Sequence, residues 1–451
     1  MGIPDANPTD GGAMSRETPK TGPGKTGPGK TGTRVNRRAF LRGGAALTAG
    51  VAAGAAGGRI VRADSAAGQP PNVPDWSRYL GSGVDAAPYG TPSPYESEVV
   101  RRNVPWLTAT PESSVNFTPL QDLHGFVTPN GLCFERHHGG VAEVDPADHR
   151  LVIHGLVEKP LVFAVDDIRR FPPVSRFYFL ECAANGGMEW HGAQLNSCQY
   201  THGMVHCVQW TGVPLKTLLA EAGLKPKAKW LLAEGADAAG MTRSVPLDKA
   251  LDDCLVAYSQ NGERLRPEQG YPLRLLVPGW EGNMWIKWLR RIEVGDMPWH
   301  TREETSKYTD VMADGKARQF TWAMDAKSVI TDPCPEKPMR RQGYHPITGL
   351  AWSGRGAIKR VDVSVDGGRN WHAARLDTPV LAKCLTRFYL DWNWSGEEVL
   401  LESRAMDETG YVQPSIVELR KVRGENSIYH NNSIQTWLVN ASGEVENVQI
   451  S

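Results

Sequence analysis

The pattern of hydrophobic and polar positions divides the chain into two structural regions. In the first, residues 101–300, short apolar runs of strand length mix with a helical pattern. The run 149–165 predicts two strands around a Lys-Pro turn, and 271–280 and 285–294 predict two more. The stretch 212–223 predicts a helix, with a proline in its first turn and a glycine just past its end. This region is therefore expected to be a mixed α/β domain.

The second region, residues 326–451, follows a polar connector at 301–325 and alternates apolar and polar residues. Val361, Val363 and Val365 face one way and lead into an Asp-Gly-Gly turn, which is a strong hairpin signal. "RFYLDWNW" and "VLLESRAM" repeat the alternation. Several short strands with turns between them predict an antiparallel β-sandwich of about 120 residues, a size typical of such domains.

The N-terminal region differs in composition from the rest. Residues 1–64 carry a Gly/Pro repeat, and then Arg37-Arg38 followed by Phe-Leu and a weakly apolar Ala/Gly run. This predicts a disordered leader ending in a twin-arginine signal, which exports folded proteins to the periplasm. The alternative is a basic linker before a membrane helix, but the run is too short and glycine-rich to span a bilayer. Residues 65–100 are rich in Pro, Gly and Ser and predict an extended segment.

The charge balance and the cysteines exclude several classes of protein. Beyond Ala63 there are 40 basic and 47 acidic residues, so a nucleic-acid surface is not expected. The seven cysteines form no Cys-x-x-Cys or Cys-x-x-Cys-His motif, and no strand leads into a glycine-rich dinucleotide fingerprint. Zinc ribbons, thioredoxin chemistry and attached haem are therefore not expected. The sequence does not say which cysteines pair, if any.

Cys182 ends a strand-like run and is followed by small residues, "CAANGG". Three interpretations compete. It could be a buried core cysteine, a nucleophile helped by His191, or a thiolate ligand whose small neighbours let a bulky cofactor approach.

Cations elsewhere favour the last interpretation. Arg136 and His138 share the segment "CFERHHGG", and Arg274 and Lys287 are expected on adjacent apolar strands. A cation in an apolar strand is unfavourable unless it has a partner, and a bound anion is one. Arginine offers a planar, permanently charged fork for an oxyanion.

"LECAANGG", "FERHHG", "YPLRLLVPGWEGNMWIKWL" and "VDVSVDGGRNWHAARL" resemble the sulfite oxidase family of molybdopterin enzymes, from about residue 100 to the C-terminus. Within it, the chain most resembles the molybdenum subunits of periplasmic Sox sulfane dehydrogenases. The resemblance implies an α+β fold, in which a sulfite-oxidase-type molybdopterin domain precedes an immunoglobulin-like domain that forms a homodimer. It also implies a molybdenum–molybdopterin cofactor and no haem in this chain.

The family's functional residues carry over by position. Cys182 would ligate molybdenum, Arg136 would lie beside the substrate oxyanion, and Tyr308 would be an active-site tyrosine. Arg274 and Lys287 would hold the phosphate end of the pterin. The remaining expected cofactor contacts are Phe134, Glu135, His137, His138, Asp237, Trp285 and Ile286.

Two positions depart from the family pattern. Gly187 stands where the sulfite-binding version has an arginine, and Gln269 replaces a histidine that usually precedes the Pro-x-Arg strand. We expect Gly187 to weaken binding of free sulfite and to leave room for a sulfur atom carried on a partner protein's flexible arm.

The sequence thus predicts a periplasmic molybdenum oxidoreductase that oxidises carrier-bound sulfane sulfur and passes electrons to a c-type cytochrome subunit. The alternatives are a sulfite dehydrogenase and a molybdopterin-dependent sulfoxide reductase that runs electrons inward. An exported β-sandwich scaffold, with Cys182 merely in its core, is the alternative without catalysis. No membrane span is expected in the mature chain.

Overall fold

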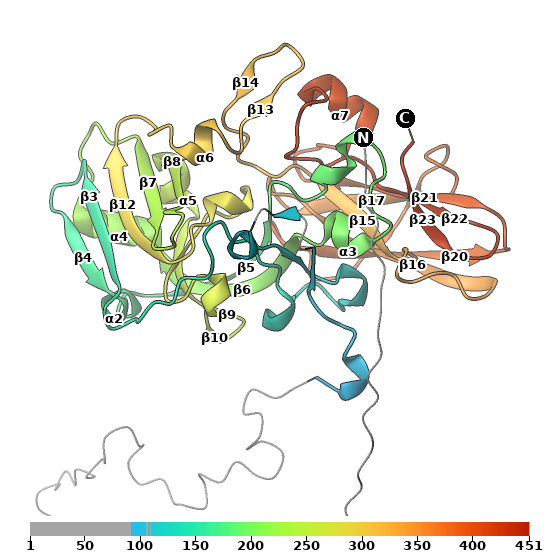
Figure 1. The fold of residues 1–451 in the computed structure, drawn as a ribbon, viewed down its shortest axis with the longest axis horizontal. Helices are drawn as coiled ribbons and strands as arrows, with labels where there is room; N and C mark the ends of the chain where they lie inside the picture. The colour runs from blue at the N-terminus through green and yellow to red at the C-terminus, as the bar shows by residue number, and fades with distance from the viewer. Residues whose placement is uncertain (1–91, 105–106, 109, 451) are drawn as a thin grey trace, which may run out of the picture. The chain divides into compact units, whose positions relative to one another are not determined.

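The computed structural model describes residues 92–450, except 105, 106 and 109. The predicted leader and export signal, and most of the predicted extended segment, lie outside the described residues. The described part forms one compact unit, Pro92–Ser451. Figure 1 shows its first half, residues 92–325, from blue through green to yellow, and its β-rich second half, residues 326–450, in orange and red. No helix of the described residues is long and apolar enough to cross a membrane.

The first half contains two five-stranded sheets. One has the order β4-β3-β12-β7-β8, and the other β10-β9-β6-β5 with β11 paired to β9. In the first sheet β12 runs parallel to β3 and antiparallel to β7, so the sheet is mixed. The strands are β3 (Arg150–Gly155), β4 (Leu161–Ala164), β5 (Val174–Glu181), β6 (Val205–Pro214), β7 (Trp230–Gly235), β8 (Thr242–Pro246), β9 (Leu255–Gln260), β10 (Glu263–Arg264), β11 (Arg274–Leu276) and β12 (Leu289–Gly295).

Short helices cover these sheets. They are α2 (Val165–Arg169), α3 (Cys198–His202), α4 (Leu215–Ala222), α5 (Leu247–Asp252) and α6 (Arg302–Thr305). Helix α4 confirms the predicted helix but starts later than predicted, because residues 212–214 end β6 and Pro214 is the N-cap. Gly223, with φ +71°, is the C-cap, and the helix buries its leucines. Glycine tolerates that left-handed conformation, so the helix ends where the sequence indicated. Two short antiparallel pairs complete this half: β1 (Arg102–Asn103) with β2 (Asn116–Phe117), and β13 (Asp310–Val311) with β14 (Ala317–Arg318).

The second half is an antiparallel sandwich of two sheets, β15-β16-β20-β19 and β18-β17-β21-β22-β23. The predicted hairpin is present, with β17 and β18 paired antiparallel. This confirms the predicted α+β class with a terminal β-sandwich. Its elements are β15 (Lys327–Asp332), β16 (Gly343–Trp352), β17 (Ile358–Ser364), β18 (His372–Ala373), β19 (Arg375–Leu376), β20 (Thr386–Trp394), β21 (Val399–Asp407), α7 (Ile416–Arg423), β22 (Thr436–Val439) and β23 (Val445–Val448).

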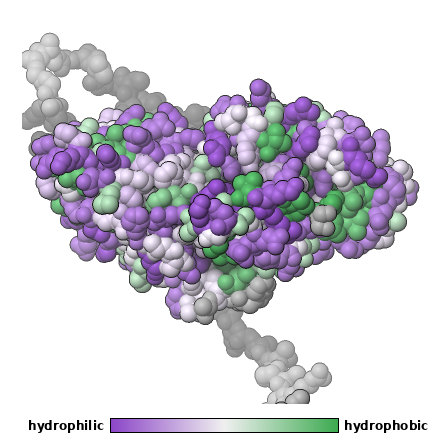
Figure 2. Space-filling view, turned by 90° about the horizontal axis from the view of Figure 1, so that it is seen from above, coloured by the Kyte–Doolittle hydropathy of each residue, from purple (hydrophilic) through white to green (hydrophobic). Residues whose placement is uncertain are grey.

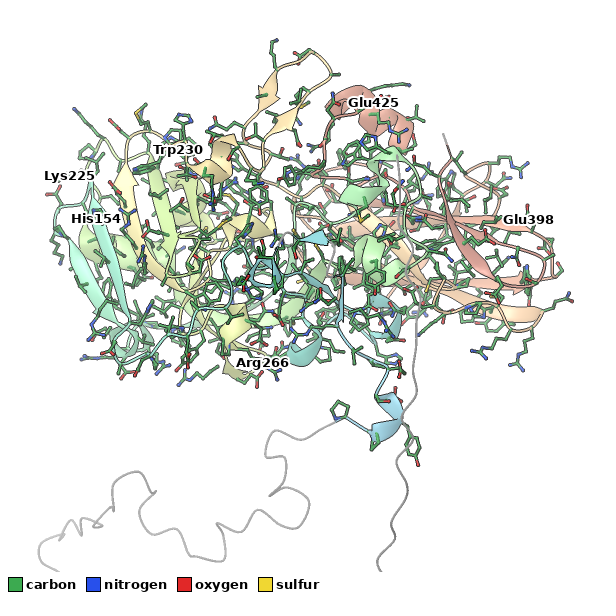
Figure 3. All side chains as sticks on the ribbon, viewed as in Figure 1. His154, Lys225, Trp230, Arg266, Glu398 and Glu425 are labelled. Atoms are coloured by element: carbon green, nitrogen blue, oxygen red, sulfur yellow. The ribbon has the colours of Figure 1, made fainter. Side chains whose placement is uncertain are left out.

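One hydrophobic cluster joins the two halves. Phe179 and Cys207, from strands of the first half, pack in the same buried cluster as Trp352, Phe388 and Trp437 of the sandwich. All seven cysteines are buried free thiols. The visible face in Figure 2 is largely hydrophilic, with hydrophobic atoms in separate small patches. Figure 3 shows Lys225 and Glu398 pointing outward at opposite ends of this unit. The cluster that contains Phe179 and Trp352 buries apolar surface between the two halves. This burial holds the sandwich against the domain that carries the candidate site.

A buried ion pair also connects the halves. Lys327, the first residue of β15, donates from Nζ to Glu181 Oε1 at 3.2 Å and to the Asn185 carbonyl at 2.9 Å. Trp352 Nε1 donates to the other oxygen of Glu181 at 2.7 Å. The Glu181 and Lys327 side chains are 0% and 2% exposed. Because Glu181 is the last residue of β5, the pair fixes the point where the chain runs into Cys182.

Replacing one partner of this pair should be strongly destabilising. Lys327→Met leaves a buried carboxylate without a cation, so we expect the free energy of unfolding to fall by about 3–5 kcal/mol. The double variant Lys327→Met/Glu181→Gln removes both charges and should recover much of that loss. Chemical denaturation of the single and double variants measures this. A single variant as stable as wild type, or a double variant less stable than the single, would contradict the account.

Candidate functional site

A cavity in the first half, here called the inner cavity, is lined by residues of β5, β6 and β11 and of the loops beside them. It is lined by all twelve residues selected from the sequence. These are Phe134, Glu135, Arg136, His137, His138, Cys182, Asp237, Arg274, Trp285, Ile286, Lys287 and Tyr308. The structure thus brings together residues spread over 175 positions of the chain. The individual roles assigned to them remain predictions.

Cys182 is placed by the end of β5. Its amide donates to the Met204 carbonyl at 3.0 Å, and its own carbonyl accepts from Asn185 N at 2.9 Å, which starts the turn that follows. Burial raises the pKa of the thiol. A protonated, buried thiol with small neighbours is a poor nucleophile without a base, and no histidine bonds to it among the described residues. A cation in the cavity would favour its thiolate form, as metal ligation requires.

Arg274 and Lys287 lack carboxylate partners within the described chain. Arg274, on β11, donates to Gln269 Oε1 at 2.9 Å and to the Gln269 carbonyl at 3.1 Å, and its buried Nε has no partner among the described atoms. Lys287 Nζ donates to the carbonyls of Arg136 and Glu268 at 3.1 and 3.2 Å.

Loss of hydration lowers the pKa of Arg274 to about 9 and holds that of Lys287 well below its ordinary value. Buried cations without counterions are unfavourable, and a bound dianion would neutralise them. The phosphate of a molybdopterin fits this requirement.

The position of Lys287 differs from the sequence-based expectation. Lys287 lies in an irregular segment before β12, not on a strand, and β11 and β12 belong to different sheets. The segment still runs beside β11, because Leu275 N bonds to the Ile286 carbonyl and Leu289 N to the Leu273 carbonyl, both at 2.8 Å. Trp288, with φ +52°, interrupts the extended backbone. Arg274 and Lys287 therefore share one cavity because the irregular segment lies beside β11, and not because they lie on adjacent strands as the sequence predicted.

Tyr308 and His138 form a hydrogen-bonded pair, with Tyr308 Oη and His138 Nε2 2.8 Å apart. Burial, with Arg136 and Lys287 nearby, lowers the pKa of His138 to about 3, and burial raises the pKa of Tyr308. Both side chains are therefore neutral near pH 7. The pair offers a neutral hydroxyl beside Cys182.

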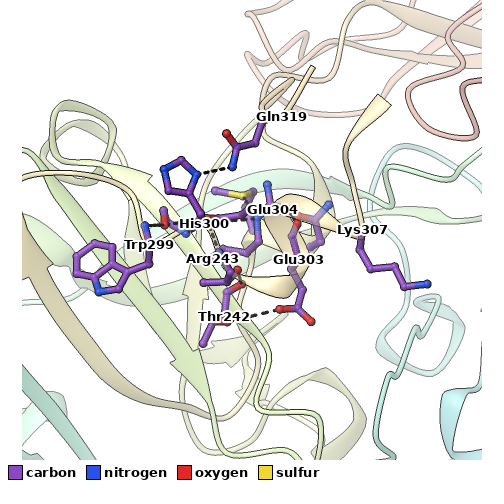
Figure 4. Close-up of polar contacts among 12 residues, drawn as sticks. Thr242, Arg243, Trp299, His300, Glu303, Glu304, Lys307 and Gln319 are labelled. Carbon is purple, nitrogen blue, oxygen red and sulfur yellow. Dashed lines mark hydrogen bonds and ion pairs between the residues drawn. The ribbon is translucent and has the colours of Figure 1, made fainter. Parts of the chain in front are cut away.

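The segment that leads to Tyr308 is anchored by a network around α6 (Figure 4). Arg243, fully buried on β8, donates to the Glu303 carbonyl at 2.5 Å and to Glu281 Oε1 at 3.2 Å. Ser244 Oγ donates to Glu304 Oε2 at 3.0 Å. Tyr308 itself has φ +53°, a conformation unfavourable for a tyrosine. The network holds the backbone in a position that orients the phenol into the cavity.

A second cavity, here called the outer cavity, meets the inner one at four residues. Arg136, His138, Cys182 and Tyr308 line both. The rest of the outer cavity is largely apolar and includes Leu107, Val115, Met188, Leu195, Met204, Ile428 and Tyr429. A group bound to Cys182 would therefore face a separate chamber suited to a substrate.

Gly187 lines the outer cavity, but its role differs from the expectation that it simply leaves room. A Cβ at this position would lie 2.5 Å from the Ile428 carbonyl oxygen, closer than real contacts allow. The neighbouring Asn431 Nδ2 donates to the Gly186 carbonyl at 3.0 Å, and His430 N to the Ala183 carbonyl at 2.7 Å. Glycine is thus required because a loop of the sandwich domain packs directly on this turn.

Among the cavity-lining residues that sequence reasoning missed, three contribute to the argument about the site. Ile428 and Tyr429 come from that loop, and the Tyr429 ring lies 5.1 Å from the Tyr308 ring. No local pattern marks them, because they reach the site only through the packing of the two halves. His206, on β6, lines the inner cavity and lies in a run, residues 205–208, that is buried on both faces of the strand. The signal in the sequence that could have identified His206 is a polar residue within a run of apolar residues that is expected to be buried.

The neutral histidines predict a pH dependence of stability in the cofactor-free chain. Burial, aided by neighbouring cations, lowers the pKa values of His137 and His138 to about 3, against an ordinary value of 6.5. Between these values the unfolded chain binds more protons than the folded chain, so stability falls as pH drops from about 6.5 toward 3. His138→Gln should reduce the slope of unfolding free energy against pH, measured by urea denaturation from pH 7 to 4. The exposed His372→Gln is the control, and an unchanged slope in His138→Gln would contradict the burial of neutral His138.

Comparison with known proteins assigns a family to this arrangement. Residues 138–303 match the oxidoreductase molybdopterin binding domain, and residues 318–437 match the Mo-co oxidoreductase dimerisation domain. The crystal structure of the sulfane dehydrogenase SoxCD from Paracoccus pantotrophus is similar, with 58% identity and a TM-score of 0.81. That match covers 85% of this chain and all of the SoxCD chain.

NADH nitrate reductases are more distant relatives. The enzyme of Solanum lycopersicum is 31% identical over 358 residues, and that of Volvox carteri 28% over 407 residues. The matches cover 70% and 80% of this chain but only 39% and 46% of those proteins. The chain thus spans less than half the length of these curated relatives. From the two matched domains and the SoxCD similarity, the chain belongs to the sulfite oxidase family of molybdopterin oxidoreductases.

Proposed function

We propose that this chain is the molybdenum-bearing catalytic subunit of an exported enzyme that oxidises a reduced sulfur atom, presented as sulfane sulfur on a carrier protein. The observation that carries the proposal is the junction of two cavities at Cys182, Arg136, His138 and Tyr308. The inner cavity suits the cofactor, and the outer one admits a substrate. The similarity to a sulfane dehydrogenase supports the choice of sulfur as the oxidised atom.

The bound cofactor would supply a two-electron redox centre that exchanges an oxygen atom with the substrate. Cys182 would hold the metal at the junction, while Arg274 and Lys287 would hold the phosphate at the far end of the inner cavity. Arg136 is fixed by donating from Nη1 to the Ser113 carbonyl at 3.0 Å. Its positive charge at the junction would stabilise negative charge that develops on oxygen.

Tyr308 and His138 would position the substrate without adding charge. Because both are neutral near pH 7, their 2.8 Å hydrogen bond is kept there. Tyr308 can then offer its hydroxyl to an anionic substrate, and the strained backbone at Tyr308 keeps that hydroxyl aimed at the junction.

The outer cavity favours a carried substrate over a small free anion. Its lining is mostly apolar, and its cations other than Arg136 are Arg302 and Lys307, which are exposed side chains. A free dianion would find few fixed charges there. A sulfur atom on a flexible arm would gain affinity from apolar contacts such as those offered by Met188 and Ile428.

The remaining parts of the proposal concern partners and location. Each two-electron oxidation requires an acceptor, and the sequence contains no haem-attachment or dinucleotide motif, so a c-type cytochrome subunit is proposed as acceptor. Dimerisation through the sandwich domain and export to the periplasm by the Arg37-Arg38 signal complete the proposal. A sulfite dehydrogenase is the second candidate, because Arg136 at the junction suits a free oxyanion as well.

Cys182→Ser should abolish turnover while the chain stays folded. Mutation of a residue that only hydrogen-bonds a metal ligand typically lowers metal affinity or activity by about 10–100-fold. Loss of the ligand itself should therefore reduce turnover by more than about 100-fold. The measurement is sulfur-dependent reduction of cytochrome c, with thermal unfolding as the folding check. Cys254→Ser is the matched control, since this buried cysteine bonds only to the Lys249 carbonyl and lies outside both cavities. Full activity in Cys182→Ser would overturn the assignment.

An arginine introduced near Gly187 should shift the substrate preference toward sulfite. Gly187→Arg would clash with the sandwich loop, whereas the Ala184 Cβ lies 3.9 Å from where a Cβ at Gly187 would stand. A hydrogen bond to a charged group contributes about 1.5–3 kcal/mol, so Ala184→Arg should raise kcat/KM for free sulfite by about tenfold or more. It should also lower turnover of the carrier-bound persulfide by narrowing the cavity.

The uncharged Ala184→Gln is the matched control and should impair the carrier reaction without improving the sulfite reaction. Wild-type enzyme that oxidises free sulfite as efficiently as the carrier-bound sulfur would contradict the proposed substrate. Equal kcat/KM values for free sulfite in Ala184→Arg and Ala184→Gln would contradict the prediction, because they would show that a positive charge at position 184 does not favour the sulfite reaction.

A further inference from the structure

His206 is a buried polar residue without a partner in the inner cavity. It lies on β6, its side chain is 0% exposed, and it lines the cavity. Neither Nδ1 nor Nε2 has a hydrogen-bond partner among the described atoms. Each unpaired buried polar atom typically reduces stability by about 1–3 kcal/mol, so a histidine with two of them needs an explanation.

The histidine is neutral. Burial holds its pKa well below the ordinary value, and the nearby positive charge of Arg274 acts in the same direction. A neutral imidazole has one N–H donor and one acceptor nitrogen. A complementary ligand would therefore present both an acceptor and a donor, and a free phosphate dianion presents acceptors only.

The surroundings of His206 form an aromatic slot with further unpaired polar atoms. The Phe134 ring lies 4.9 Å from the imidazole and the Trp210 ring 6.2 Å from it. Arg274 lies 5.4 Å above Trp210, and its buried Nε also lacks a partner among the described atoms. Aromatic side chains beside unpaired donors and acceptors in one cavity suit a planar heterocycle that also carries an anionic group.

We propose that His206 is a cofactor-binding residue that hydrogen-bonds the polar edge of the pterin heterocycle, beside the anion held by Arg274. The edge of a pterin offers both ring N–H donors and carbonyl or ring-nitrogen acceptors, so it can pair with the His206 nitrogen that faces it whether that nitrogen is the donor or the acceptor. The inference rests on the family's cofactor and is independent of which sulfur compound is oxidised.

The test is the amount of cofactor retained by the purified full-length protein, not its turnover. His206→Phe keeps an aromatic ring between Phe134 and Trp210 and removes only the two nitrogens. Molybdenum is measured by elemental analysis, and pterin by the fluorescence of its oxidised form after denaturation, each per folded chain. The loss of one hydrogen bond of ordinary strength should increase the cofactor dissociation constant by about tenfold. His206→Gln, which keeps a donor and an acceptor, should retain more cofactor than His206→Phe.

His202→Phe is the matched control. His202 is equally buried, but its Nδ1 bonds to Thr201 Oγ1 at 2.9 Å and it lines neither cavity, so this variant should keep its cofactor. If His206→Phe does not fold, the molybdenum and pterin content of His206→Ala is measured instead, because alanine introduces no steric clash. A folded His206→Phe or His206→Ala protein with wild-type molybdenum and pterin content would overturn the proposal. Loss of pterin from the folded His206→Phe or His206→Ala protein would support the role of His206. This outcome does not depend on which sulfur compound the enzyme oxidises, so it leaves the proposed function untouched.

Discussion

The buried ion pair between Glu181 and Lys327 is the interaction on which the site depends. It joins the last residue of β5 to the first residue of β15, and it lies one residue before Cys182. An ion pair in a dry interior stabilises little by itself, but it penalises any arrangement that separates the partners. The sandwich domain is therefore part of the machinery that positions the cysteine. The same docking brings Ile428 and Tyr429 into the outer cavity.

A second constraint is the burial of two cations in the inner cavity without ion-pair partners. Arg274 and Lys287 are desolvated without carboxylate partners in the described chain, and Arg274 Nε and both nitrogens of His206 are left without hydrogen bonds there. Such a cavity is unfavourable when empty and becomes complementary when an anionic heterocycle fills it. Cofactor binding would thus contribute directly to folding stability. A protein exported in its folded state would then carry its cofactor with it.

The sequence was most informative where chemistry and local pattern coincide. The strand that ends just before Cys182, the helix at 215–222 and the hairpin after β17 follow from apolar periodicity and turn residues. Residue chemistry singled out five of the twelve candidate site residues and a family resemblance supplied the other seven, and the fold gathers all twelve in one cavity. Lys287 shows the limit of that approach, because an irregular segment beside β11 looked like a strand in the sequence. Gly187 shows another limit, since its constraint is a carbonyl 241 residues away. Long-range packing of this kind leaves no local pattern.

The central claim is that Cys182 holds a metal at the junction between a cofactor cavity and a substrate cavity. Anomalous X-ray diffraction at the molybdenum absorption edge, from crystals of the purified loaded protein, tests it most directly. The account predicts one molybdenum peak per chain within bonding distance of Cys182 Sγ, with the pterin density extending into the inner cavity toward Arg274 and Lys287. A peak at any other position, or an active protein without a molybdenum peak, would contradict it.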